Sequence, residues 1–417
     1  MAENDTNLFA PHDLTFLRGA PYVFHCHHYN LFHDQTVDDI LGDDAGRKLR
    51  TDASRSAFHQ VLRGLCEAEG CRTPAETIQL AQATFAAMGH GRLTLDVTRE
   101  GGTARGVHTH YGYTWGEKYG SFVNRREPAD AVAAGFAAAT TEVAFGLPSG
   151  SMQVLETQCV AKRDPACTFE IRPAVVQPLP PSVSREDFAR LLGASEGGEH
   201  EERVQDITGK LQAFLAGVSG DERGLVQAFG VFVTMHLANY YNETAFSAVR
   251  EVEKSMPAAV PTAEALLREA GHVCVFNTVG GILRSPEWEA VAGPLRNDPT
   301  EIVVGCTAIA RGLGFGRWTI KEFQPGERLV VSATSTYAAP FYRARFGLSD
   351  KPRSYFLEGA VLAFMVLAQR IDWESRPEFT TELYAELFRG SGLGFRSETT
   401  RCLAQGHERS EIVVTLG

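Results

Sequence analysis

The sequence has no excess of positive charge, and this excludes the partners that a basic surface serves. Its 40 lysines and arginines stand against 51 aspartates and glutamates, which gives a net charge of −11. Binding to nucleic acid or to an anionic membrane needs a basic surface that neutralises phosphate groups. The sequence also has no run of about 18 apolar residues that could span a bilayer. We therefore expect neither nucleic acid nor a membrane as a partner.

Cysteine is sparse, and the N-terminus has none of the features of a secretion signal. The eight cysteines are scattered, without the dense framework of a disulfide-stabilised secreted protein. Residues 1–13 are acidic and polar, whereas a signal peptide has a basic and then an apolar region. The sequence also lacks a Gly-x-Ser-x-Gly motif and a convincing Ser/His/Asp set. The scattered cysteines and the lack of signal-peptide features predict a reduced, cytoplasmic protein.

What the sequence does contain is an internal repeat, because four blocks recur in the same order in its two halves. Residues 23–28 match residues 231–236 with identical spacing, which pairs His28 with His236. The other matches are 89–94 with 314–319, the Ala-rich segments 130–146 and 354–370, and 156–159 with 398–402, one residue out of step. Two divergent copies of one domain are the interpretation that these blocks favour.

The repeat predicts two domains and a linker. Residues 174–204 contain prolines and a polar, charged stretch that are typical of a linker, so we expect domains at 1–173 and 205–417. Each copy has helix-period segments first, then a hairpin, an Ala-rich helix and a second hairpin. In the first copy the hairpins are expected at 93–113 and 152–173. This order predicts an α+β fold, with helices packed on an antiparallel sheet.

The second hairpin of the first copy carries a candidate metal site. Glu156, Cys159 and Cys167 lie on its two arms, and thiolates with a carboxylate suit zinc. Strict alternation along a strand places Glu156 and Cys159 on opposite faces, so a shared metal requires the strand to end or bulge between them. The alternative is a pair of buried, inert cysteines beside an exposed glutamate.

This hairpin and the Ala-rich helix before it resemble the end of a 4-vinyl reductase domain. That family has a Glu, a Cys three residues on and a Gly/Asp-x-x-Cys-x-Phe turn, which residues 156–169 match. The resemblance implies an α/β fold shared with trafficking-complex subunits and haem-NO-binding domains, often dimeric, around an apolar cavity. Family members include sensor domains of aromatic-responsive bacterial activators and a protein of bacteriochlorophyll synthesis.

The resemblance also implies a structural zinc on Glu156, Cys159 and Cys167, with one further cysteine upstream as the fourth ligand. This chain departs from the family there, because Ala133 and Ala134 lie where that cysteine is expected. The fourth ligand stays open. The second copy departs further, since it offers only Cys402, with Ser410 opposite Cys167.

A second candidate site is a group of histidines, nine of the thirteen lying within the first 110 residues. On a strand, His108 and His110 share one face, and His25 and His27 likewise share a face. Neutral imidazoles suit zinc, iron, copper or nickel, so a second metal such as iron is one interpretation. The site would be built from His27 or His28 together with His108 and His110. The alternative is a set of interior histidines bonded to backbone or tyrosines.

Aromatic residues crowd the same regions of the first copy. They either line a pocket for an apolar or planar ligand or simply pack in the core. The candidate ligand-binding residues are Tyr29, Tyr111, Tyr113 and Trp115.

Three functions are compatible with these features. The first is a metal-containing protein of the 4-vinyl reductase type that binds a small hydrophobic or aromatic molecule, as a monomer or homodimer. The second is a metalloenzyme in which the histidines hold a catalytic zinc or iron and act on a small molecule. The third is an assembly or trafficking adaptor without chemistry. The uneven distribution of histidine favours the first two.

Overall fold

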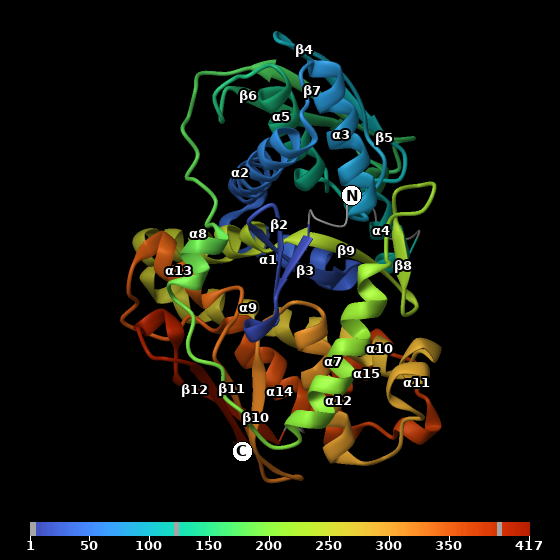
Figure 1. Ribbon diagram of the computed structural model, residues 1–417, viewed down its shortest axis with the longest axis vertical. Coiled ribbons are helices and arrows are strands. Elements are labelled where there is room, and N and C mark those ends of the chain that lie inside the picture. The colour runs from blue at the N-terminus through green and yellow to red at the C-terminus, as the bar shows by residue number, and fades with distance from the viewer. Residues whose placement is uncertain (1–5, 121–124, 390–393) are drawn as a thin grey trace.

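The protein consists of helices and antiparallel sheets, which confirms the α+β prediction (Figure 1). The structure, a computed structural model, describes residues 6–120, 125–389 and 394–417. No helix within these ranges is both long and apolar enough to cross a membrane. The strands form three sheets, of which one is central and two are peripheral.

The central sheet combines strands from both halves of the chain. It has the order β1-β2-β3-β9-β8. Strand β3 pairs antiparallel with β9, and Phe24 lies opposite Met235. In Figure 1 this sheet lies between the blue and teal half of the molecule and the orange and red half. The strands are β1 (Thr6–Phe9), β2 (Leu14–Leu17), β3 (Ala20–Cys26), β8 (Val226–Ala228) and β9 (Val231–Leu237).

Each half adds a four-stranded sheet of its own, and the two sheets have the same strand order. The first is β4-β5-β7-β6 and the second is β10-β11-β13-β12. The strands are β4 (Thr94–Thr98), β5 (Gly101–Gly106), β6 (Met152–Gln158) and β7 (Cys167–Pro173), then β10 (Trp318–Gln324), β11 (Arg328–Ala333), β12 (Phe395–Arg401) and β13 (Ser410–Leu416).

The equivalent strands β6 and β12 also have a bulge in the same place. It lies between Glu156 and Gln158 in one and between Thr399 and Arg401 in the other. The shared order and bulge are the structural form of the sequence repeat. The boundaries at 173 and 205 stay a prediction.

The helices fill the space between these sheets. In the first half α2 packs on α5, and in the second half α9 packs on α14. Alanines and Gly135 let α2 and α5 approach closely, since a Cβ on Gly135 would lie 2.5 Å from the carbonyl oxygen of Thr51. The main helices are α1 (His27–Leu41), α2 (Asp43–Glu69), α3 (Pro74–Ala87), α4 (His110–Tyr119), α5 (Ala131–Ala144), α7 (Glu201–Ala216), α8 (Ala238–Ser255), α9 (Val260–Cys274), α12 (Pro299–Gly312) and α14 (Tyr355–Arg370).

The structure corrects the register of the repeat. Strand β3 ends at Cys26 and β9 ends at Leu237, and a helix begins at the next residue in both cases. His236 therefore corresponds to His25, and the predicted match of His28 with His236 is wrong. The ungapped match followed local sequence similarity, whereas the strand ends fix which residues are equivalent.

One further expectation needs correction. The strand expected to run to residue 113 ends at Gly106, because helix α4 begins at His110. The segment expected as a linker contains the short helix α6 (Arg185–Ala189) and the first turn of α7. Phe188 of α6 is fully buried and packs edge-on against Phe16 of β2. This segment is therefore part of the folded structure.

A buried ion network joins the helices beside the central sheet. Arg50 of α2 contacts Asp34 at 2.9 Å and Asp38 at 2.7 Å, both on α1. Arg125 contacts Asp38 at 2.7 Å, and the Tyr240 hydroxyl of α8 donates to Asp34 at 2.6 Å. The side chains of Arg50, Asp34 and Asp38 are almost completely buried. The network thus connects α1, α2 and α8 across the two halves.

We expect Arg50→Met to lower the free energy of unfolding by about 3–5 kcal/mol, because it removes the cation that pairs with buried Asp34 and leaves buried Asp38 with Arg125 alone. Arg63→Met is the matched control on the same helix, since Arg63 pairs with Glu67 at 3.6 Å in solvent. That exposed pair contributes at most about 1 kcal/mol. Denaturant unfolding of both variants measures the difference, and equal losses would contradict the role assigned to Arg50.

Candidate functional site

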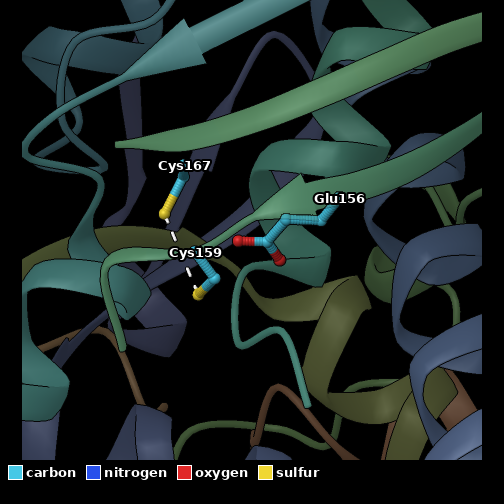
Figure 2. Close-up of side chains that lie close together, drawn as sticks. All are labelled: Glu156, Cys159 and Cys167. Carbon is cyan, nitrogen blue, oxygen red and sulfur yellow. Dashed lines mark hydrogen bonds between the residues drawn. The ribbon is translucent and has the colours of Figure 1, made fainter. Parts of the chain in front are cut away.

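The hairpin of β6 and β7 gathers three potential metal ligands. The ligand atoms of Glu156, Cys159 and Cys167 all lie within 4.8 Å of one another, and the two Sγ atoms are 4.0 Å apart. Figure 2 shows the three side chains pointing toward one another from the end of β6 and the start of β7. Within the described ranges, this is the one group of three or more His, Cys, Asp or Glu residues with that geometry.

A bulge brings Glu156 and Cys159 to the same side of the hairpin. The register of β6 against β7 shifts between Glu156 and Gln158, and the strand ends directly before Cys159. A short 3-10 turn at Val160–Lys162 then carries the chain toward β7. A shared metal required β6 to bulge or end between Glu156 and Cys159, and it does both.

Backbone N–H groups converge on the same three side chains. Asp130 N donates to Glu156 Oε2 at 2.8 Å, Ala129 N to Cys159 Sγ at 3.3 Å, and Val160 N to Cys167 Sγ at 3.4 Å. The Thr109 hydroxyl donates to Cys167 Sγ at 3.2 Å. These donors stabilise negative charge on the sulfur atoms and on the carboxylate.

The protonation of the three groups is strongly linked. The hydrogen bond from the Cys167 thiol lowers the pKa of Cys159 to about 6, and the same bond raises the pKa of Cys167. Burial, with the charges of Cys159 and Asp130, raises the pKa of Glu156 well above its ordinary value. Glu156 Oε1 is buried and makes no hydrogen bond of ordinary length to any described residue. A cation would supply the positive partner that Glu156 lacks.

The chemistry of this donor set fits zinc. Thiolates and carboxylates both bind zinc, which structural sites usually hold with four donors in a tetrahedron. The three side chains are almost completely buried, and the hydrogen bonds that they accept come from the chain itself. The arrangement therefore suits a structural ion more than a catalytic ion that must leave a coordination position open for substrate.

A groove of about 620 Å³ runs along the outside of the same site, between α2, α5 and β6. Glu156 is one of the residues that line the groove, so the groove and the cluster have this residue in common. The apolar wall consists of Ala131, Ala134, Ala138, Met152 and Leu155.

The candidate histidines of α1 do not join this site. His27 begins α1, and its Nδ1 accepts from Phe232 N at 3.3 Å. The His27 and His28 rings lie 4.0 Å apart. Burial and nearby Lys118 lower the pKa of His27 to about 4, while burial and His27 lower that of His28 to about 2.

The other candidate pair is separated by the end of β5. The expectation that His108 and His110 share a strand face is wrong, because β5 ends at Gly106 and His110 begins α4. His108 lies beside the Tyr113 ring, whereas His110 Nε2 accepts from the Asn30 side chain at 3.0 Å. Among the described residues, these four histidines do not form a group of three ligands within 4.8 Å. A metal site built from them stays a prediction without geometric support.

Sequence reasoning missed how two other histidines are placed. His236 of β9 accepts from the Tyr111 hydroxyl at 3.0 Å and lies 4.9 Å from the His90 ring. In the equivalent place His25 stacks 4.8 Å from Phe315. His90 and Phe315 match in the repeat, but nothing in the sequence indicated that the strand histidines pack against them. Each half thus inserts a strand histidine into the interior of the other.

The aromatic residues that were expected to bind a ligand do not line one pocket. Tyr29 stacks on His25 at 3.8 Å and borders a cavity of about 30 Å³, which has room for about two waters. Tyr111, Tyr113 and Trp115 all lie on α4, and none of them borders the groove. Tyr111 and Trp115 are buried in the core, whereas Tyr113 is half-buried beside Phe232.

Comparison with known proteins assigns no family. No family model matches the chain, and no curated protein matches it. One solved structure with some similarity is the phenol-responsive sensory domain of the transcription activator PoxR with phenol. It is 14% identical to this chain, and the match covers 38% of this chain and 80% of the sensory domain, with a TM-score of 0.32. A score of this size establishes neither a shared fold nor a ligand.

The buried His90 predicts a loss of stability in acid. Burial lowers its pKa to about 3, and neither ring nitrogen makes a hydrogen bond of ordinary length to a described residue. Because this folded pKa lies below the unfolded value, stability is full above about pH 6.5 and falls toward pH 3 by about 1.4 kcal/mol per pH unit.

We therefore test His90→Phe, because phenylalanine stands at the matching position 315. Between pH 6.5 and 4.5 we expect its unfolding free energy to fall less steeply than that of the wild type, by about 1.4 kcal/mol per pH unit. His200→Asn is the control, since His200 is exposed and sits in a left-handed conformation that Asn tolerates. Denaturant unfolding at each pH gives both slopes. An unchanged slope in His90→Phe would show that His90 is not buried in its neutral form.

Proposed function

We propose that this chain is a metal-containing protein of the 4-vinyl reductase type that binds a small hydrophobic or aromatic molecule. The observation that carries the proposal is the Glu156, Cys159 and Cys167 cluster on the wall of a groove. In this proposal the cluster binds the structural ion, and the groove binds the small molecule. Resemblance of the hairpin motif to that family supports the same assignment.

The zinc proposed here has a structural task. Zinc bound by Cys159 and Cys167 holds the two arms of the β6–β7 hairpin together, and Glu156 extends this connection to the groove. The N-terminus of α5 and the Thr109 hydroxyl already contact the same atoms. The ion therefore fixes the position of α5, which forms the apolar wall of the groove.

The groove suits an apolar ligand of moderate size. Its volume of about 620 Å³ lies within the range of about 300–1,000 Å³ that small-molecule sites have. Cations line its rim, but Lys48 and Arg55 both pair with Asp52 at 2.6 Å. Because both cations already share Asp52, the apolar side chains of the groove, above all the exposed Leu155, supply most of the favourable contact.

The other two functions have less support. A histidine-based metalloenzyme needs imidazoles that converge, whereas His27 and His28 lie on α1 and His108 lies beside Tyr113. An adaptor has no use for a buried cluster of thiols in one half. Homodimer formation and a cytoplasmic location stay predictions.

Metal analysis tests the metal part of the proposal. We expect about one zinc per purified chain, lost in Cys159→Ala and retained in His108→Ala, because only Cys159 belongs to the cluster. Cys402→Ala is the matched control, since Cys402 occupies the corresponding place before β13 and is equally buried. Zinc that disappears with His108→Ala instead would support the metalloenzyme, and no metal in the wild-type protein would refute both.

Ligand binding tests the groove. We expect fused-ring aromatic probes such as indole and 2-naphthol to stabilise the folded protein and so raise its melting temperature. The stabilisation is about 2.7 kcal/mol when the probe is present at 100 times its Kd. Leu155→Glu should weaken the affinity for these probes at least about tenfold, since it places a charge on the apolar wall. Leu348→Glu, which changes another exposed leucine outside the groove, should leave it unchanged. Equal shifts in all three proteins would place binding elsewhere.

A further inference from the structure

Asp130 is a buried carboxylate with one oxygen in use and one free. It is the residue directly before α5, and its Oδ1 accepts from Ala133 N at 2.9 Å, which caps that helix. Its Oδ2 is buried and makes no hydrogen bond of ordinary length to any described residue. The side chain is only 2% exposed. A buried carboxylate oxygen without a partner is costly, so it calls for an explanation.

The surroundings of Asp130 are those of the metal cluster. Its own N–H donates to Glu156 Oε2 at 2.8 Å, and the N–H of Ala129 donates to Cys159 Sγ. Burial raises the pKa of Asp130 to about 6, and the Asp130 charge in turn raises the pKa values of Glu156 and Cys167. The Asp130 carboxylate thus lies near the three ligand groups, but outside the set of ligand atoms that all lie within 4.8 Å of one another.

The second half shows the same arrangement with neutral side chains. Ser354 precedes α14 as Asp130 precedes α5, and its hydroxyl lies 3.2 Å from Cys402 Sγ and 3.3 Å from Ser410 Oγ. The backbone donors recur as well, with Arg353 N bonded to Cys402 Sγ and Leu403 N to Ser410 Oγ. The residue before this helix therefore belongs to the cluster in both halves.

We propose that Asp130 is the fourth ligand of the metal site, so that the ion is held by two cysteines, one glutamate and one aspartate. This inference rests on the metal site proposed above and completes it. It would also account for the missing cysteine on α5, because Asp130, the N-cap of that helix, would supply the fourth donor in its place.

The environment suits a site with four anionic donors. The backbone N–H groups of Ala129, Asp130 and Val160 and the Thr109 hydroxyl already donate to them. The N-terminus of α5 adds the positive end of a helix dipole. In the second half these anions are replaced by Thr399, Ser410 and Ser354, so only Cys402 remains as a soft donor.

Asp130→Asn tests the assignment without removing the helix cap, because Asn caps helices as well as Asp does. We expect zinc affinity, measured by chelator competition, to fall at least about tenfold, and the visible spectrum of the cobalt-loaded protein to change. Asp298→Asn is the matched control, since Asp298 caps α12 through Thr300 N and Glu301 N, away from the cluster. It should leave both measurements unchanged.

Asp130→Cys provides a second measurement that does not depend on loss of metal. It should retain the ion and strengthen the sulfur-to-cobalt absorption by roughly half, because three thiolates replace two. An unchanged affinity and spectrum in Asp130→Asn, together with metal loss in Cys159→Ala, would overturn the role of Asp130 but leave the metal site standing. Metal that persists in Cys159→Ala would overturn the site itself.

The second half allows the converse experiment. The substitutions Thr399→Glu and Ser410→Cys beside Cys402 should bind a second zinc tightly only when Ser354→Asp is added. A second equivalent of equal affinity with or without Ser354→Asp would contradict the proposal, because the fourth position would then be dispensable. Circular dichroism of each variant confirms that it folds.

Discussion

The pairing of β3 with β9 is the constraint on which the rest of the structure depends. These strands belong to different halves, yet they are neighbours in one sheet and each leads directly into a long helix. Contacts between equivalent residues follow from this symmetry. The Tyr241 hydroxyl donates to Asn30 at 2.6 Å, and His33 lies 2.8 Å from the Thr244 hydroxyl. Neither half therefore has a complete interior without the other.

Much of the architecture could be predicted from the sequence, because it depends on local spacing. Helix and strand periods define an α+β unit, and the spacing of Glu156, Cys159 and Cys167 defines a hairpin site. The repeated blocks predict two similar units. In each case the determining residues lie within one element or in two that are adjacent in the chain.

What could not be predicted depends on contacts between distant segments. The exchange of His25 and His236 between the halves depends on a strand pairing that leaves no local mark in the sequence. His110 was placed on a strand because it follows one closely, but the chain turns into helix α4 first. Asp130 was visible as a residue before an Ala-rich helix, and only the fold brings that helix end to the hairpin.

The shared central sheet also has a consequence for how the protein is made. Residues of β3 leave the ribosome long before those of β9, so one edge of β3 has no neighbour while the intervening chain is synthesised. An unpaired and largely apolar strand edge is prone to join other chains. Strand β2, which also pairs with β1, covers the opposite edge of β3 from the start. Completion of the first half thus waits on synthesis of the second, and the nascent chain is most exposed to chaperones and to misassembly during that interval.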